Sequence, residues 1–260
     1  MRPEMKKILI IAVAVVVLLV TGTVVGSCDR NSSEGVAAPT AAPAVEASTE
    51  PEHIQGQPVD ESWFSDAVFV GDSVTLKLSY YCDNNPDALG GAQFFCAGSL
   101  GYGNALWDID DPSAVHPFYK GANHLAEESA ELTGAKKVFI MLGMNDIALY
   151  GIDGAISYAD ELFGRILART PDVQLYVQSV TPILSGHEIG DWNNENIREF
   201  NSRLSSYCTA HKYTFIDLYS VMADETGYLR SEYCGDPDAQ GVHFTDVACM
   251  KWIETLKNSV

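Results

Sequence analysis

Five short apolar segments, each followed by a helical pattern or a turn, constrain the fold of this chain more than any other feature. The segments are residues 67–70, 92–97, 136–142, 173–180 and 214–218. Helical patterns cover residues 74–82, 124–132, 154–170, 194–212 and 245–258. Strands that alternate with helices pair in parallel through right-handed crossovers. The sequence therefore predicts an α/β fold, a three-layer α/β/α sandwich around a parallel sheet of about five strands.

The amino terminus does not share this pattern. Three positive charges in residues 1–7 precede an unbroken apolar run over residues 8–20 and a stretch of small residues that ends at Cys28. This arrangement is typical of a secretory signal or a membrane anchor. Residues 25–28, Val-Gly-Ser-Cys, resemble a bacterial lipobox, in which the cysteine is lipidated. The alternative is an uncleaved transmembrane helix, since residues 8–26 could cross a hydrocarbon core of about 30 Å.

Residues 29–60 are rich in Ala, Pro, Ser, Thr and Glu and contain hardly any large apolar residue. Such a segment cannot bury a core, so we expect a disordered linker. The remaining residues, 61–260, are predicted to form the functional domain. Together the three segments predict an extracytoplasmic domain that is tethered to the membrane of a bacterial cell by a lipid or a helix.

Charge and cysteine content exclude several classes of function. The chain has 35 acidic and 16 basic residues, a formal net charge of -19, and no basic stripe, so it is not expected to bind nucleic acid. Apart from Cys28, five cysteines remain without zinc-site spacing, and we expect mostly buried packing residues with at most one or two disulfides. Asp236 and Asp238 do not complete a calcium loop of the pattern Asp-x-Asp-x-Asp-Gly, because the third acidic position is occupied by Gln240. We expect a monomer without metal or cofactor.

Polar motifs follow the predicted strands. Gly71-Asp72-Ser73 comes directly after residues 67–70, Gly143-Met144-Asn145-Asp146 comes after residues 136–142, and His243 precedes the last helix. In parallel sheets, ligands bind outside the carboxyl ends of the strands, which lie along one edge. A serine at the first turn of a helix also has unpaired backbone N–H groups beside it. These motifs are therefore expected to form one site.

The chain from about Ser65 to Leu256 resembles the SGNH (GDSL-type) hydrolases, which are named for Ser, Gly, Asn and His in four separated blocks. Gly71-Asp-Ser73 matches the first block, Gly143-Met-Asn-Asp146 the third, and Gly241-Val-His-Phe-Thr245 the last. The glycine of the second block is best matched by Gly101, with Gly98 as the alternative. The resemblance implies a flavodoxin-like sheet and an esterase that uses no cofactor.

The chemistry of an esterase explains these residue types. A serine hydroxyl needs a base to take its proton, and histidine is a usable base near neutral pH. Ser73 is therefore the predicted nucleophile and His243 its base. Attack on an ester creates an oxyanion, which donors in the site must stabilise. The resemblance assigns this role to the N–H of Ser73, the N–H of Gly101 and the side-chain amide of Asn145.

The acid of the triad is where the chain departs from the family pattern. The family usually has an aspartate three residues before the histidine, a position occupied here by Gln240. A carboxylate orients the imidazole and stabilises its cation. We predict that Asp238 supplies it. Asp236 is the alternative, and a Ser73–His243 dyad without a carboxylate is a third possibility.

The predicted function is hydrolysis of small acyl esters, above all O-acetyl groups on a polysaccharide, through an acyl-enzyme. An acyltransferase of the same fold would use the same residues. A carbohydrate-binding surface protein with a degenerate site is an alternative of another class, which Gln240 keeps open. Tyr102, Trp107, Tyr119 and Trp192 are candidates either to line the substrate pocket or to pack in the core.

Overall fold

The structure is a computed structural model, and it describes residues 57–260 of the chain. The predicted signal or anchor (residues 1–28), its Cys28 lipidation site, and most of the predicted linker (residues 29–60) lie outside the described residues. The last residues of the linker are described. Val59 is buried, and its N–H donates to the carbonyl oxygen of Lys257 at 2.9 Å. The folded domain therefore begins before the predicted boundary at Glu61.

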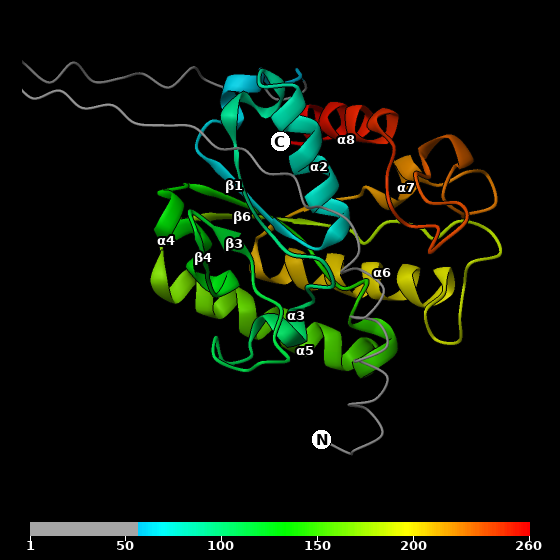
Figure 1. Cartoon of the computed structure of the whole chain (residues 1–260), viewed down its shortest axis with the longest axis horizontal. Coiled ribbons are helices and arrows are strands. Elements are labelled where there is room, and N and C mark those ends of the chain that lie inside the picture. The colour runs from blue at the N-terminus through cyan, green and yellow to red at the C-terminus, as the bar shows by residue number, and fades with distance from the viewer. Residues whose placement is uncertain (1–56) are drawn as a thin grey trace, which may run out of the picture. The chain divides into compact units, whose positions relative to one another are not determined.

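Five parallel strands form the central sheet (Figure 1). Their order across the sheet is β2-β1-β5-β6-β7. They are β1 (Ala67–Gly71), β2 (Gln93–Cys96), β5 (Lys137–Met141), β6 (Gln174–Gln178) and β7 (Thr214–Ile216). All five agree with the apolar segments, and the predicted α/β fold is confirmed. The order of the strands reverses between β1 and β5, so the point where such sheets bind ligands lies between the ends of these two strands.

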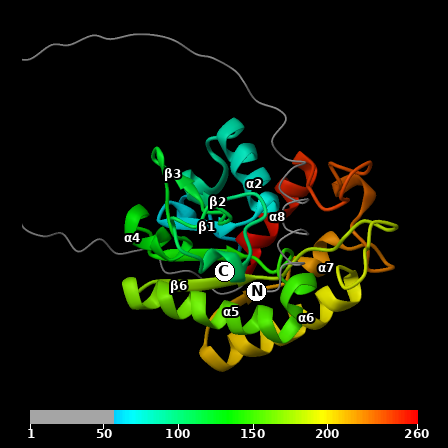
Figure 2. The same ribbon diagram turned by 60° about the horizontal axis from the view of Figure 1, so that its bottom comes forward.

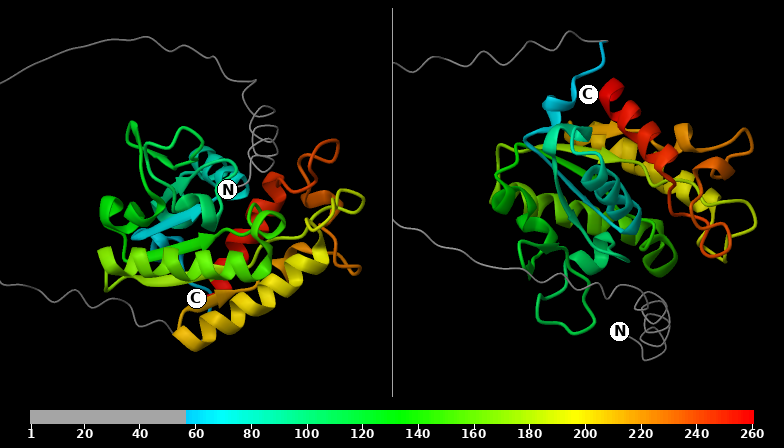
Figure 3. Two further views of the ribbon diagram at one scale, coloured as in Figure 1. Left: turned by 90° about the horizontal axis from the view of Figure 1, so that it is seen from below. Right: turned by 45° about the horizontal axis from the view of Figure 1, so that its top comes forward.

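Helices cover both faces of the sheet. On one side lie α2 (Ser73–Asn84), α7 (Tyr219–Met222) and α8 (Asp246–Ser259); on the other lie α3 (Tyr102–Ala105), α4 (Ser129–Thr133), α5 (Ile147–Arg169) and α6 (Asn194–His211). Figure 2 shows the sheet between α2 and α8 above and α5 and α6 below, and Figure 3 shows the same layers from two further directions.

Side chains that alternate along each strand pack into two cores, one on each face of the sheet. In β1, Val68 and Val70 belong to the core under α5 and α6, whereas Ala67 and Phe69 belong to the core under α2 and α8. Side chains of successive strand residues point to opposite faces. Because both faces are covered, the strands contain continuous apolar sequences, which is why they could be recognised.

The structure differs from the predicted elements in two regions. Helix α5 begins at Ile147, before the predicted start at residue 154, but it is kinked at Gly151, where a non-helical φ of 68° separates a first turn from the long helix that was predicted. Residues 104–123, which show no clear helix or strand pattern in the sequence, contain β3 (Phe118–Tyr119) and β4 (Ala122–Asn123), an antiparallel pair joined through Lys120 and Gly121. Short 3-10 helices occupy Glu61–Phe64, Ala88–Gly91, Ala126–Glu128 and Ser231–Tyr233.

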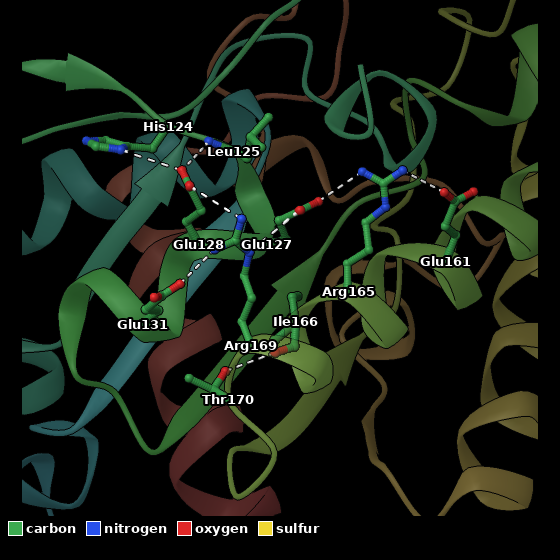
Figure 4. A network of polar contacts seen from close by, with 10 residues as sticks. All are labelled: His124, Leu125, Glu127, Glu128, Glu131, Glu161, Arg165, Ile166, Arg169 and Thr170. Carbon is green, nitrogen blue, oxygen red and sulfur yellow. Dashed lines mark hydrogen bonds and ion pairs between the residues drawn. The ribbon is translucent and has the colours of Figure 1, made fainter. Parts of the chain in front are cut away.

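An ion-pair network fastens α4 and the preceding turn to α5 (Figure 4). Arg165 contacts Glu127 at 3.1 Å, and Arg169 contacts Glu131 at 2.8 Å. Arg169 also lies 3.6 Å from both Glu127 and Glu128. Several charges that share partners stabilise more than an isolated surface pair does. The network holds the segment that leads into β5, away from the ends of the strands where the polar motifs lie.

Five cysteines lie in the described part, and all of them are free thiols: Cys82, Cys96, Cys208, Cys234 and Cys249. Four are buried, as packing residues are expected to be, and no disulfide joins any of them. Among residues 57–260, no helix is long and apolar enough to cross a membrane.

Candidate active site

Ser73 lies where β1 meets α2. The strand ends at Gly71, Asp72 caps the helix by accepting a hydrogen bond from the N–H of Val74 at 2.9 Å, and Ser73 is the first helical residue. Among residues 57–260, no acceptor is found for the N–H of Ser73. The serine therefore has its own unpaired donor beside its hydroxyl, as the first turn of a helix provides.

A relay of two hydrogen bonds connects Ser73 to a carboxylate. The Nε2 atom of His243 lies 2.9 Å from the Oγ of Ser73, and its Nδ1 atom lies 2.7 Å from the Oδ2 of Asp236. Because a carboxylate only accepts hydrogen bonds, Nδ1 carries the proton and Nε2 is free to accept the hydroxyl proton of Ser73. These three residues have the geometry of a nucleophile, a base and an orienting acid.

Backbone donors fix the carboxylate of Asp236. Its Oδ1 accepts from the N–H groups of Val242 and His243, each at 3.0 Å, and its Oδ2 accepts from the N–H of Gln240 at 3.2 Å. Partial burial pushes the pKa of Asp236 up, but the hydrogen bonds from the side chain and backbone of His243 bring the pKa below its ordinary value. Asp236 is therefore held as an anion in one orientation.

The prediction of Asp238 as the triad acid is wrong, since the carboxylate that contacts the imidazole is that of Asp236. The chain forms a turn directly after Asp236. The N–H groups of Ala239 and Gly241 donate to the backbone carbonyl oxygen of Asp236. This turn places Asp238 on its outer side, where it is exposed. Gln240 contributes only its backbone N–H, so it does not replace the missing acid.

The second and third motifs meet beside Ser73. The Nδ2 atom of Asn145 donates to the carbonyl oxygen of Leu100 at 2.9 Å and to the Oδ2 of Asp72 at 3.3 Å. The Gly101 N–H donates to the Oδ1 of Asn104 at 2.7 Å. The predicted oxyanion donors are thus close together, but two of them are bonded to protein acceptors. An oxyanion would have to replace those acceptors.

Asp146 holds the Gly101 loop in position. Its carboxylate is buried and accepts hydrogen bonds from the N–H groups of Tyr102 and Gly103 at 2.8 and 2.9 Å. A Cβ atom at Gly101 would lie 2.6 Å from Oδ2 of Asp146, whereas one at Gly98 would meet nothing within 4 Å. Gly101 is therefore the sterically required glycine of the two. Burial raises the pKa of Asp146 to about 6.

Burial also raises the pKa of Asp72 to about 6, although its hydrogen bonds and the nearby His243 lower that pKa.

Of the aromatic candidates for the substrate pocket, Tyr102 is fully buried and packs between Phe163 and Phe200, so it belongs to the core. Within residues 57–260, no group of three metal-ligating side chains could hold a metal ion.

Three features of the site were not predicted from the sequence. They are the hydrogen bonds of Asp146 to the Gly101 loop, the hydrogen bond of Asn104 to Gly101, and the role of Asp236 in place of Asp238. The first could have been suspected from the acidic residue that directly follows Asn145. The other two depend on loop geometry that has no signal in the sequence.

Comparisons with known proteins agree with this geometry. A family model described as the GDSL-like Lipase/Acylhydrolase family matches residues 69–248, which include Ser73 and His243. No curated protein matches the chain. Solved structures with the same fold include a Streptococcus pneumonia protein named for platelet activating factor, with a TM-score of 0.55 and 19% identity over 74% of this chain and 82% of that one.

A second is a GDSL-like lipase from Bacteroides thetaiotaomicron, with a TM-score of 0.53 and 19% identity over 76% of this chain and 88% of that one. A third is a carbohydrate esterase family 3 structure from Talaromyces cellulolyticus, with a TM-score of 0.50 and 14% identity over 74% of this chain and 94% of that one. At these identities the neighbours establish the fold, while the family model covers more than half of the chain. The protein belongs to the GDSL-like Lipase/Acylhydrolase family, the SGNH hydrolases, and is a carboxylic ester hydrolase.

Proposed function

We propose that this enzyme removes small acyl groups, above all O-acetyl, from carbohydrate through an acyl-enzyme intermediate on Ser73. The observation that carries this proposal is the relay from Ser73 through His243 to Asp236, with contacts of 2.9 and 2.7 Å. His243 takes the hydroxyl proton while Ser73 Oγ bonds to the ester carbonyl carbon. The alcohol then leaves with that proton, and water, activated by His243, releases the acid from Ser73.

We propose a polar cavity as the surface that binds a carbohydrate alcohol. The cavity, of about 460 Å³, lies between the loop after β6, the start of α6 and the loop after α7, and is lined by Glu188, Asn193, Glu195, Arg198, Tyr228 and neighbouring residues. Carboxylate, amide, guanidinium and phenol groups can bond to the many hydroxyls of a sugar. One fold neighbour is a carbohydrate esterase, which fits this proposal. The net charge of -19 favours a neutral sugar over an anionic one.

A fluorophosphonate probe and a panel of acetylated substrates test the proposal. We expect the probe to label the wild type but not Ser73→Ala, and acetate to be released from acetylated xylan faster than butyrate or longer acids from matched p-nitrophenyl esters. Absence of labelling in folded wild type would overturn the esterase mechanism and favour a binding protein. Transfer of acetyl to a sugar acceptor in preference to water would identify an acyltransferase.

We also propose that the enzyme acts outside the cytoplasmic membrane and is attached to it by lipidated Cys28. The lipobox-like residues 25–28 and the linker-like composition of residues 29–60 support this location. In a bacterial host, the full chain should partition into detergent and Cys28→Ser should not. If Cys28→Ser stays in the membrane fraction, the anchor is a transmembrane helix instead.

A further inference from the structure

We infer that His187 is a positioning residue for the triad: it holds the loop that carries Asp236 by bonding to the carbonyl oxygen of Pro237. This inference rests on the Ser73–His243–Asp236 relay of the proposed function. It assigns a role in the reaction to a histidine that lies outside all four family motifs and touches none of the three relay residues.

The loop that needs holding is longer than the family pattern. The acid stands seven residues before the histidine, at Asp236, instead of three. The added length forms a turn whose tip is exposed, from Asp238 to Gln240. Bonds within the turn fix the carboxylate relative to His243, and Cys234, Val242 and Phe244 at the base of the turn pack in the cores. The exposed part of the turn is held by contacts with another segment.

The segment that makes these contacts is the loop after β6. The Nε2 atom of His187 lies 2.9 Å from the carbonyl oxygen of Pro237, directly after the acid. The N–H of Leu184 donates to the carbonyl oxygen of Gly241 at 2.8 Å, near the other end of the turn. The loop after β6 therefore holds the turn at both ends, and the hydrogen bond of His187 is the only side-chain bond of the two.

The ring of His187 also packs on the turn. A Cβ atom at Gly241 would lie 2.7 Å from Cγ of His187, and Gly241 has a φ of 69°, which favours glycine. The other ring nitrogen, Nδ1, lies 3.2 Å from the carbonyl oxygen of Ser185 in its own loop. Both ring nitrogens face carbonyl oxygens and a neutral imidazole has one N–H, so we assign the N–H to Nε2, which makes the shorter contact, with Pro237.

Three variants separate this hydrogen bond from packing, with p-nitrophenyl acetate as the substrate. His187→Phe keeps a ring over Gly241 but has no donor, His187→Ala loses both, and His187→Gln retains an amide donor. We expect kcat to fall about 2- to 13-fold in the Phe and Ala variants, the range of one net hydrogen bond, with KM unchanged. His187→Gln should recover most of kcat. His211→Gln, an exposed histidine on α6, is the matched control.

Two further measurements test whether His187 affects kcat through the position of Asp236. The far-downfield proton NMR signal of His243 Nδ1, which reports its bond to Asp236, should weaken in His187→Phe and return in His187→Gln. In an Asp236→Asn background, His187→Phe should cost nothing more, because the group that it positions is gone. Equal kcat in Phe and wild type, a change in KM alone, or full additivity with Asp236→Asn would overturn the inference. An inactive wild type would instead refute the proposed esterase function.

Discussion

Replacing Asp236 by asparagine is expected to disable the base without unfolding the loop. The Oδ1 of Asp236 accepts from the N–H groups of Val242 and His243, so only an oxygen fits there. The amide NH2 of the variant must then face the Nδ1 of His243, in the place of Oδ2. Because an NH2 group only donates, His243 must shift its proton to Nε2. It can then no longer accept the proton of Ser73.

The magnitude follows from this change of tautomer. The same substitution in a Ser-His-Asp triad with intact geometry lowers kcat about 10⁴-fold. At 1.36 kcal/mol per factor of ten, this corresponds to about 5.4 kcal/mol of lost transition-state stabilisation. We expect a loss of about 10³- to 10⁴-fold here, since the His243 Nδ1 to Asp236 Oδ2 distance of 2.7 Å is that of a charge-assisted bond.

Steady-state hydrolysis of p-nitrophenyl acetate measures the loss, with circular dichroism as the check on folding. Asp238→Asn is the matched control, because it makes the same chemical change on the exposed side of the same turn. It should remain within about twofold of the wild type, as surface substitutions usually do. A folded Asp236→Asn enzyme within tenfold of wild type, or an equal loss in Asp238→Asn, would refute the assignment of the acid.

Three other predictions concern stability and the oxyanion donors. Asn104→Ala should lower the free energy of unfolding by about 1 kcal/mol in urea titrations. Because the change frees the Gly101 N–H, kcat should stay equal or rise. A large loss of kcat would instead show that the 2.7 Å contact with Asn104 positions this donor. Burial raises the pKa of Asp72 and of Asp146 to about 6, so the folded protein binds protons that the unfolded chain releases above about pH 4. The free energy of unfolding should therefore fall as the pH rises from about 4 to about 6, with a shallower slope in Asp146→Asn; identical slopes would contradict these pKa values. Arg169→Met should cost about 1 kcal/mol at low salt and less in 1 M NaCl, and a cost that does not depend on salt would mean that packing, not charge, accounts for it.

The predictable part of the site is the part that regular structure positions. Ser73 and Asn145 follow apolar strands, and the carboxyl ends of parallel strands converge at one edge whatever the loops do. His243 could be placed because it directly precedes a helix that packs on the same sheet. For these residues, the pattern of strands and helices contains most of the geometric information.

The unpredictable part is set by loops. Whether Asp236 or Asp238 reaches the imidazole depends on one turn, and the sequence offers both carboxylates at similar distances along the chain. The contact between His187 and Pro237 joins residues that are 50 positions apart. The β3–β4 pair was missed because two-residue strands have no periodicity, although Lys120-Gly121, with φ of 47° and 93°, is a turn that a hairpin search could have found.

Helices α2 and α8 both begin at the site, at Ser73 and at Asp246 shortly after His243. The aligned peptide dipoles of a helix place about half a positive charge at its N-terminus. An oxyanion on Ser73 would therefore form at the positive end of α2, and this contribution comes from the backbone and not from a lysine or arginine. Peptide groups do not titrate, so the contribution stays constant while the net charge of the chain changes with pH.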